Sequence, residues 1–175
     1  MIPTRSIIYL TGFMGTGKTS VGRELARRLR RPFVDLDTHI ESRSGRTIAE
    51  LFSRGPAVFR RSESQALRRT SRRPGLVVAL GGGALLAPAN RRLAADSGVL
   101  VCLTCAEDRL WLRLRADATL RPLLGSGPRR RKRLRRLLAR RRSLYRQADL
   151  SVSTTRRTPA QAAALIARKL KGRLL

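Results

Sequence analysis

The sequence predicts an α/β domain built on a parallel β-sheet, and three observations lead to that prediction. Short apolar segments alternate with segments of helical periodicity along most of the chain, which is the pattern of strands joined by crossover helices. Residues 12–19, GFMGTGKT, match the phosphate-binding loop G-x-x-x-x-G-K-[ST], between an apolar run and a helical pattern. The length of 175 residues suits a single domain, spanning residues 1–175, with a core of its own.

The first half of the chain is expected to alternate between strands and helices, beginning with a strand. In order, the elements are the strand Ile7–Leu10, the helix Lys18–Leu29, the strand Phe33–Leu36, and the helices Asp37–Arg43, Ile48–Ser53 and Pro56–Thr70. The strands are short apolar runs, whereas Val21, Leu25 and Leu29 recur at the helical spacing of one buried face. Pro56 stands where proline favours the first turn of a helix.

The second half repeats the alternation. Its expected elements are the strands Leu76–Leu80, Val99–Leu103 and Leu150–Val152, with the helices Pro88–Ala95, Glu107–Arg113, Arg130–Gln147 and Pro159–Leu170. Pro88 and Pro159 again suit helix starts. In the strongly basic segment from residue 129 onward, Leu134, Leu137 and Leu144 keep helical periodicity, which indicates an amphipathic helix with a basic outer face.

Two segments interrupt this rhythm. Gly81–Gly83 follows a predicted strand directly, at the sheet edge where open α/β domains bind ligands. Residues 116–128 carry two prolines and two glycines and no helical cap, so they are expected to form a mobile loop. We interpret this loop as a candidate lid, with Arg121 able to close on a transferred phosphoryl group.

Composition narrows the class of protein. The chain lacks an apolar run long enough for a membrane span, and we expect a cytoplasmic protein without a membrane partner. The net charge of +28, nearly all from arginine, would attract polyanions at low salt. Most of these arginines are scattered along the chain, so the charge alone identifies no partner. Cys102 and Cys105 are expected to be reduced and to fill space, because one C-x-x-C pair and one histidine cannot supply a four-ligand zinc site.

The phosphate-binding loop predicts a nucleotide site. A strand that enters a glycine turn and leaves as a helix points several backbone N–H groups, and the positive end of the helix dipole, at one place. Lys18 can reach the β- and γ-phosphates, and the Thr19 hydroxyl can bind Mg²⁺.

Acidic residues after the second strand supply further candidates. Asp35 and Asp37 would face the same way along an extended segment, so one could hold the magnesium shell through water while the other orients or deprotonates an attacking hydroxyl. The alternative for Asp37 is a helix N-cap. Arg60 and Glu63 stand one helical turn apart, which taken alone would suit a surface ion pair.

Together these motifs resemble the shikimate kinase family, within the nucleoside-monophosphate-kinase-like P-loop proteins, over residues 7–167. The motifs that carry the resemblance are the phosphate-binding loop, Asp35-Leu36-Asp37, residues 44–48 with Phe52, Phe59-Arg60 with Glu63, Gly81–Gly83, residues 121–124, and Arg141 four residues before Tyr145. The resemblance implies a three-layer fold, with a five-stranded parallel sheet flanked by helices, substrate-binding helices at about residues 37–70 and a lid at about 114–128.

The resemblance also implies ATP-dependent phosphorylation of the shikimate 3-hydroxyl, with Mg²⁺ as cofactor. Catalytic roles would fall to Asp37, Lys18 and Arg121, and metal binding to Thr19 and, through water, Asp35. The implied ATP-binding residues are Gly12, Gly15, Thr16, Gly17, Lys18, Thr19, Ser20, Arg113 and Arg121. The implied shikimate-binding residues are Asp37, Phe52, Phe59, Arg60, Glu63, Gly81, Gly82, Gly83 and Arg141.

Some features depart from the family pattern, and two other functions remain open. Ser143 stands where the family often has proline, the segment after Tyr145 is one residue short, and Ser153 replaces a common acidic residue. The alternatives are another small-molecule kinase, such as a gluconate kinase, and a nucleotide-regulated nucleic-acid-binding protein. The second would need clustered basic residues with aromatic stacking partners, and aromatic residues make up only 4% of the chain. We therefore expect shikimate and ATP as partners, no specific nucleic acid, and a monomer.

Overall fold

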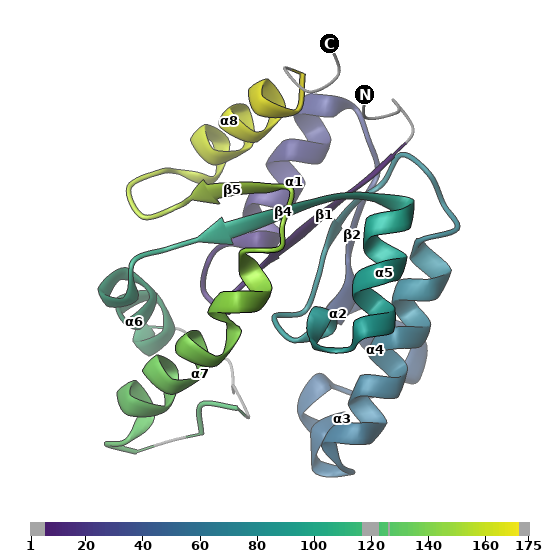
Figure 1. Ribbon diagram of the computed structural model, residues 1–175. Coiled ribbons are helices and arrows are strands. Elements are labelled where there is room, and N and C mark those ends of the chain that lie inside the picture. The colour runs from purple at the N-terminus through teal and green to yellow at the C-terminus, as the bar shows by residue number, and fades with distance from the viewer. Residues whose placement is uncertain (1–5, 117–122, 126, 172–175) are drawn as a thin grey trace.

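A computed structural model of the protein describes residues 6–116, 123–125 and 127–171. Its centre is a five-stranded sheet in the order β2-β3-β1-β4-β5, in which all neighbouring strands are parallel (Figure 1). The strands are β1 (Ile7–Gly12), β2 (Phe33–Asp35), β3 (Val77–Ala79), β4 (Gly98–Thr104) and β5 (Leu150–Ser153). The predicted α/β class and parallel sheet are confirmed.

Helices connect the strands. They are α1 (Lys18–Leu29), α2 (Leu36–Ser44), α3 (Ile48–Ser53), α4 (Pro56–Thr70), α5 (Pro88–Ser97), α6 (Glu107–Ala116), α7 (Arg130–Tyr145) and α8 (Pro159–Lys171), with one 3-10 turn, η1 (Ala84–Leu86). Proline occupies the first turn of α4 and of α5, as expected. Within the described residues, no helix has the length and hydropathy needed to cross a bilayer.

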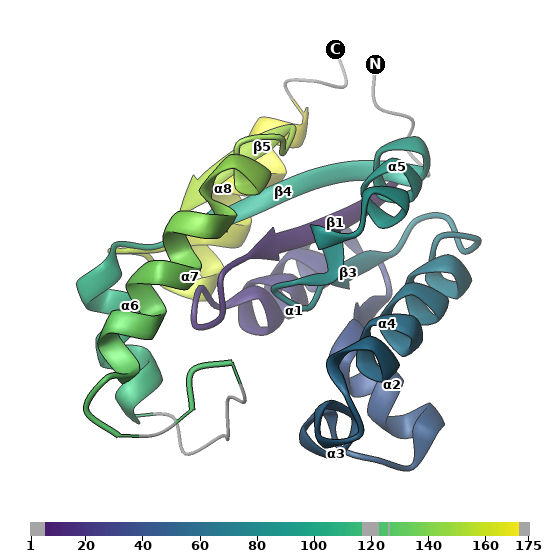
Figure 2. The same ribbon diagram turned by 60° about the horizontal axis from the view of Figure 1, so that its bottom comes forward.

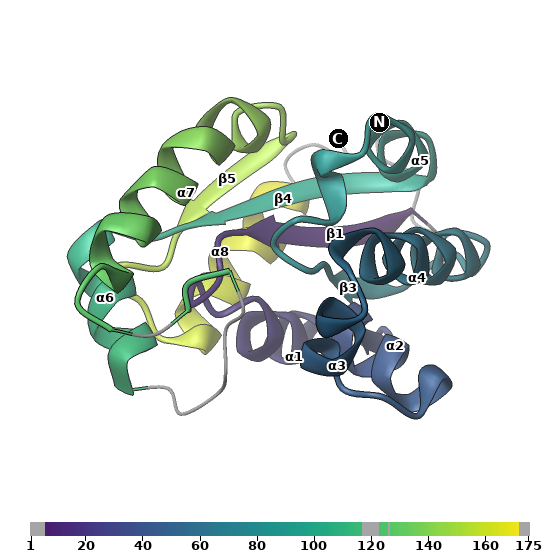
Figure 3. The same ribbon diagram turned by 90° about the horizontal axis from the view of Figure 1, so that it is seen from below.

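The sheet is covered on both faces, which explains why all six residues of β1 are buried. In Figure 3, α1 and α8 lie on one side of the sheet, while α5 and α7 lie on the other. Ile8 and Leu10 of β1 pack with α1 and α8, whereas Ile7 and Tyr9 pack towards α2, α4 and α5. The period-2 alternation of a strand therefore divides one short apolar run between two hydrophobic cores.

A third, smaller core lies beside the phosphate-binding loop. It consists of Phe13, Leu110, Leu114, Leu124 and Leu134, and we call it the α6–α7 cluster. Figure 2 shows α6 and α7 on one side of the carboxyl end of the sheet, and α2, α3 and α4 on the other. The β1–α1 loop runs between these two groups of helices, so the fold offers two opposing walls around it.

Three boundary predictions are corrected by the structure. Strand β2 ends at Asp35, and Asp37 lies in the first turn of α2, so the two carboxylates are not i and i+2 on one extended strand. The Asp35 side chain caps α2 by accepting hydrogen bonds from the backbone N–H groups of Asp37 and Thr38, so the N-cap is Asp35 and not Asp37. The predicted helix Glu107–Arg113 is too short, because α6 continues through Ala116 and Leu114 is fully buried within it, while the lid at about residues 114–128 stays a prediction.

Candidate active site

The phosphate-binding loop leaves β1 at the centre of the sheet and enters α1 with the geometry that anion binding requires. Gly12 has φ +135°, and a Cβ there would overlap the carbonyl oxygen of Leu103 on the neighbouring strand. Gly17 is left-handed at φ +87° and forms the N-cap of α1 without a side chain in the way. The N-terminal N–H groups of α1 therefore face an open space, where a phosphate can bind.

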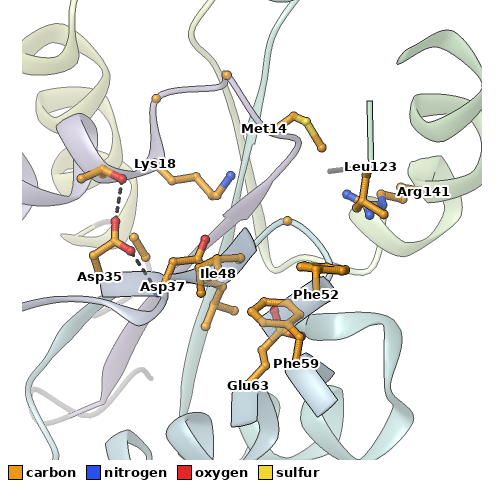
Figure 4. Close-up of a pocket in the computed structure, with 18 of the residues that line it drawn as sticks. Met14, Lys18, Asp35, Asp37, Ile48, Phe52, Phe59, Glu63, Leu123 and Arg141 are labelled. Carbon is orange, nitrogen blue, oxygen red and sulfur yellow. Dashed lines mark hydrogen bonds between the residues drawn. The ribbon is translucent and has the colours of Figure 1, made fainter. Parts of the chain in front are cut away.

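Lys18 folds along this loop. Its Nζ donates hydrogen bonds to the carbonyl oxygens of Gly12 and Phe13, both at 3.0 Å. These contacts place the ammonium group over the loop. Figure 4 shows it pointing into the pocket, with Asp37 across from it.

Thr19 and Asp35 form a pair at the start of α1. The Thr19 hydroxyl donates a 2.6 Å hydrogen bond to Asp35 Oδ2, while Asp35 Oδ1 caps α2. Hydroxyl and carboxylate oxygens are the hard ligands that Mg²⁺ prefers. The donor set fits the expected magnesium site beside the phosphate-binding loop.

These residues belong to a pocket of about 300 Å³. Its lining comes from the phosphate-binding loop, α2, α3, α4, the glycine turn after β3, Leu123 and α7 (Figure 4). Most of the predicted residues meet here: Gly15, Gly17, Lys18, Thr19, Ser20, Asp35, Asp37, Phe52, Phe59, Arg60, Glu63, Gly81, Gly82, Gly83 and Arg141. Segments separated by more than a hundred residues thus line a single pocket.

The glycine turn is required for space. A Cβ on Gly81 would lie 2.7 Å from Glu63 Oε1 and 2.9 Å from Asp37 Oδ1. A Cβ on Gly83 would overlap the guanidinium of Arg60, and one on Gly82 would lie 3.2 Å from Arg141 Nη1. None of these three glycines has a positive φ. The lack of a side chain at these three positions leaves room for the Glu63, Asp37, Arg60 and Arg141 side chains that lie against them.

Arg60 and Glu63 form an ion pair inside the pocket, not on the surface. Arg60 Nη1 donates to Glu63 Oε2 at 2.5 Å, and the Glu63 side chain is only 1% exposed. The Arg60 guanidinium also lies 5.0 Å from the ring centroid of Phe59 and 5.8 Å from that of Phe52. These contacts fix the direction of the guanidinium, which remains accessible at the pocket wall.

Burial controls the protonation of Glu63. Removal from water raises the pKa of its carboxyl, and the negative charge of Asp37 adds to the rise. Arg60, by charge and by hydrogen bond, and Arg141, by charge, act in the opposite direction. The net result is a raised pKa for a carboxyl whose main contact is the arginine that it orients.

The burial of Arg141 is unexpected on α7, a helix predicted to have a basic outer face. Its side chain is buried, with 4% exposure, and its guanidinium lies 5.6 Å from the ring centroid of Phe13. Arg141 Nη1 has no hydrogen-bond partner among the described residues. A buried guanidinium with a vacant donor, facing a pocket, is suited to bind an anion such as a carboxylate.

Aromatic and aliphatic side chains form the remaining wall. Phe52 of α3 and Phe59 of α4 stack with ring centroids 4.5 Å apart. The capping box of Thr47 and Glu50 fixes the start of α3 and thereby the position of Phe52. This wall can pack against the face of a six-carbon ring.

Five lining residues were not assigned roles from the sequence, namely Met14, Ile48, Ala79, Leu80 and Leu123. Met14 fills a variable position of the phosphate-binding loop, so the motif itself gave no signal. Ile48 and Leu123 belong to segments 44–48 and 121–124, which the sequence did single out as family motifs. The signal that could have assigned Ile48 and Leu123 to the pocket was their position as apolar residues within motifs noted for their polar groups.

Arg113 lies on the far side of the phosphate-binding loop. Its guanidinium donates to the carbonyl of Gly15 at 3.1 Å and to the carbonyl of Thr154 at 3.0 Å. Thr154 in turn donates to the carbonyl of Thr16 at 3.0 Å, so the loop after β5 is joined to the phosphate-binding loop. A shallow hollow beside it is lined by Ser153, Thr155, Arg156, Arg157 and Gln161. This position next to the phosphate-binding loop is compatible with the predicted contact of Arg113 with a nucleotide base.

Two other predicted residues lie outside the pocket, and a third lies outside the described residues. Gly12 and Thr16 do not line the pocket. Thr16 is buried, and its hydroxyl donates to the carbonyl of Phe13 at 2.8 Å. Arg121, the proposed end of the lid, lies outside the described residues, as do residues 117–120, 122 and 126 of the same segment.

Cys102 and Cys105 are free thiols. Cys102 is fully buried in β4, and burial raises the pKa of its thiol to about 11. Such a thiol is unreactive, and its side chain fills space in the sheet.

The phosphate-binding loop follows the central strand of a parallel sheet and faces a second pocket wall built by α2 to α4. This arrangement defines a P-loop kinase of the nucleoside-monophosphate-kinase-like type. The chain belongs to the shikimate kinase family, whose family model matches residues 14–171.

Relatives cover most of the chain. It is 44% identical over 174 residues to the shikimate kinase of Cereibacter sphaeroides, covering 99% of this chain and 86% of the relative. It is 48% identical over 153 residues to that of Synechococcus sp. (strain CC9605), covering 87% and 76%. Among solved structures, the shikimate kinase from Acinetobacter baumannii in complex with shikimate superposes with a TM-score of 0.92 at 36% identity, covering 98% of this chain and 96% of that one.

A gluconokinase from Sinorhizobium meliloti superposes less well, with a TM-score of 0.63 at 18% identity, covering 97% of this chain and 98% of that one. That likeness shows a shared fold and nothing about the acceptor. The predicted fold class, family and enzyme class are therefore confirmed, and the roles of individual site residues stay predictions.

Proposed function

We propose that the protein transfers the γ-phosphoryl group of ATP to the 3-hydroxyl of shikimate, giving shikimate 3-phosphate and ADP in the biosynthesis of aromatic amino acids. The observation that carries this proposal is the convergence of Arg60 and Arg141 on Gly83 and Gly82 of one glycine turn, within the pocket that Lys18 enters. Membership of the shikimate kinase family supports it.

The two arginines account for the choice of an acceptor with a carboxylate. Guanidinium groups offer paired N–H donors that match the two oxygens of a carboxylate. Glu63 orients Arg60, and Phe13 supports Arg141 from behind. A gluconate is also a carboxylate, but the stacked faces of Phe52 and Phe59 favour a ring over an open chain.

The acceptor hydroxyl would lie against Asp37 and the glycine turn. Asp37 Oδ1 faces Gly81, and the side chain points into the pocket opposite Lys18 (Figure 4). A carboxylate there can accept the hydroxyl proton as the oxygen attacks phosphorus, or can orient that hydroxyl for attack. As the P–O bond to ADP breaks, negative charge builds on the β-phosphate and Lys18 stabilises it.

Mg²⁺ would be held by the Thr19 hydroxyl and, through water, by Asp35. When bound, such an ion would offset the negative charge of the triphosphate and so favour transfer of its terminal phosphoryl group. Arg113 would contact the adenine, and Arg121 would bridge both substrates when the lid closes. We further propose that the enzyme acts as a monomer in the cytoplasm.

Acceptor choice tests the proposal directly. ADP release is measured with shikimate, gluconate, a nucleoside monophosphate and no acceptor, and the phosphorylated product is identified by mass. We expect turnover with shikimate well above the other three. Turnover with gluconate instead, or equal ADP release without an acceptor, would refute the proposal.

The high positive charge allows a second test against a polyanion-binding role. Binding to a nucleic acid through phosphate contacts weakens steeply as salt increases. Turnover at saturating substrate concentrations should change little over the same range.

A further inference from the structure

Tyr145 joins two parts of the molecule that otherwise pack separately. It is the last residue of α7, and its ring packs against both the core on the α2, α4 and α5 side of the sheet and the α6–α7 cluster. It does not line the substrate pocket. Any effect of Tyr145 on the acceptor must therefore act through other residues.

The hydroxyl of Tyr145 reaches two groups that do line the pocket. It donates a 3.3 Å hydrogen bond to the carbonyl of Gly82, in the glycine turn. Arg141, one helical turn earlier on α7, is its second neighbour, close enough to act on the pKa of the phenol. Burial raises the pKa of this phenol to about 12, so it remains a neutral donor at physiological pH.

Arg141 needs such support. Its buried guanidinium lies over the face of Phe13, and its Nη1 has no hydrogen-bond partner among the described residues. Arg141 Nη1 would also lie 3.2 Å from a Cβ on Gly82, so Gly82 and Arg141 are close neighbours. The Tyr145 hydroxyl therefore bonds the residue against which Arg141 lies.

We propose that Tyr145 is a positioning residue for the acceptor. Its hydroxyl holds the Gly82 carbonyl in place beside the Arg141 guanidinium, so that the carboxylate and hydroxyls of shikimate meet one prealigned wall. This inference rests on the proposed function, because it assigns a substrate to the same pocket.

The test is Tyr145→Phe, which keeps the ring and its packing and removes only the hydroxyl. We expect KM for shikimate to rise by about 3- to 10-fold, the range for loss of one hydrogen bond. The kcat value should stay within about twofold and KM for ATP should not change. A kcat loss with an unchanged shikimate KM would overturn the inference, as would no change in either.

The only other tyrosine supplies the matched control. Tyr9 is fully buried in β1, and its hydroxyl bonds Ser97 Oγ at 2.8 Å, away from the pocket. Tyr9→Phe should lower Tm and leave KM for shikimate unchanged. If Tyr9→Phe raised the shikimate KM as much as Tyr145→Phe, the effect would be one of general stability and the inference would fail.

A double-mutant comparison identifies the residue through which Tyr145 acts. Tyr145→Phe is combined with Arg141→Lys and, separately, with Arg60→Lys. We expect strong non-additivity in the shikimate KM with Arg141 and weaker coupling with Arg60. Equal coupling, or none, would overturn the inference. Wild-type protein without shikimate turnover would instead refute the proposed function itself.

Discussion

The Thr19 hydroxyl and the Asp35 carboxylate are joined by a 2.6 Å hydrogen bond that links the first turn of α1 to the N-cap of α2. One carboxylate thus serves two purposes, because one oxygen faces the proposed magnesium site and the other starts the next helix. The nucleotide side of the pocket and the first helix of the acceptor side are therefore built on the same residue.

The two functions of Asp35 can be separated by substitution. Asp35→Asn keeps a good N-cap but removes the charge, so stability should hold while the Mg²⁺ concentration for half-maximal turnover rises ~10-fold or more. Asp35→Ala should show the same metal effect and also lose about 1 kcal/mol of unfolding free energy. Turnover against total Mg²⁺, with urea unfolding alongside, measures both. An Asp35→Asn enzyme with an unchanged Mg²⁺ requirement would contradict the metal role.

Lys18 is predicted to stabilise the charge that develops on the transferred group. Lys18→Ala should reduce kcat by about 10²-fold or more, as does the loss of one preorganised donor elsewhere. Lys169→Ala, on the exposed face of α8, serves as the control for loss of one lysine. Near-normal turnover of Lys18→Ala in a steady-state assay would refute the assignment.

Asp37 is predicted to act on the reacting hydroxyl. Asp37→Asn keeps the shape of the side chain but cannot accept a proton, so kcat should fall by roughly 10²- to 10⁴-fold. A smaller loss would indicate that Asp37 only orients the hydroxyl. Asp96→Asn, exposed on α5, controls for the loss of one carboxylate. Wild-type kcat in the Asp37 variant would reject both roles.

Gly83→Ala should displace a side chain without unfolding the protein. The added Cβ would overlap the flexible end of Arg60 and not the backbone, so Tm should change little. The displaced guanidinium would lose its alignment, and KM for shikimate should rise roughly 10- to 100-fold, as for a lost hydrogen bond to a charged group. Gly82→Ala, where the Cβ would lie 3.2 Å from Arg141 Nη1, should give a smaller rise. The reverse order would contradict this packing.

Glu63 links pH to stability. Because folding raises the pKa of Glu63 above its ordinary value of 4.5, the folded state favours the protonated form. The stability contributed by this group is therefore present below about pH 4.5 and declines as the pH rises through the folded-state pKa. The unfolding free energy of wild type minus that of Glu63→Gln should decrease as pH rises.

The same substitution should weaken acceptor binding. Glu63→Gln removes the charge that orients Arg60, so KM for shikimate should increase even where the variant is the more stable protein. Urea unfolding from pH 4 to pH 8, with shikimate kinetics at neutral pH, measures the two effects. Glu24→Gln, at an exposed ion pair of α1, is the control. A difference in stability that grows with pH would contradict the role of burial.

The sequence predicted the sheet, most helix bounds and most of the pocket lining. It failed at the β2–α2 boundary because Leu36 extends an apolar run, although the Asp35 side chain ends the strand by capping the helix. Periodicity measures burial, whereas this boundary depends on a local hydrogen bond. The 3-10 turn η1 was missed for a similar reason, since three residues are too few to show a period.

The binding role of Arg141 was implied only by the family resemblance and its burial was not predicted, although a physical signal was present. Arg141 stands seven residues after Leu134 and three before Leu144, on the apolar stripe of α7. An arginine at such a position has to be buried, and a buried guanidinium needs an anion or an aromatic face. The ion pair of Arg60 with Glu63 was correct in spacing, but its burial depends on the glycine turn and could not be predicted locally.

Because β1, β2 and β3 are held in register, Leu10 and Asp35 both pair with Ala79. The segments that follow these strands therefore leave the sheet at the same height along the strands. They are the phosphate-binding loop, the start of α2 with Asp37, and the glycine turn. The relative height of these three segments is therefore set by the hydrogen bonds of the sheet. Three basic residues, Lys18, Arg60 and Arg141, line the pocket that these segments form, and most of the net charge of +28 comes from basic residues elsewhere in the chain.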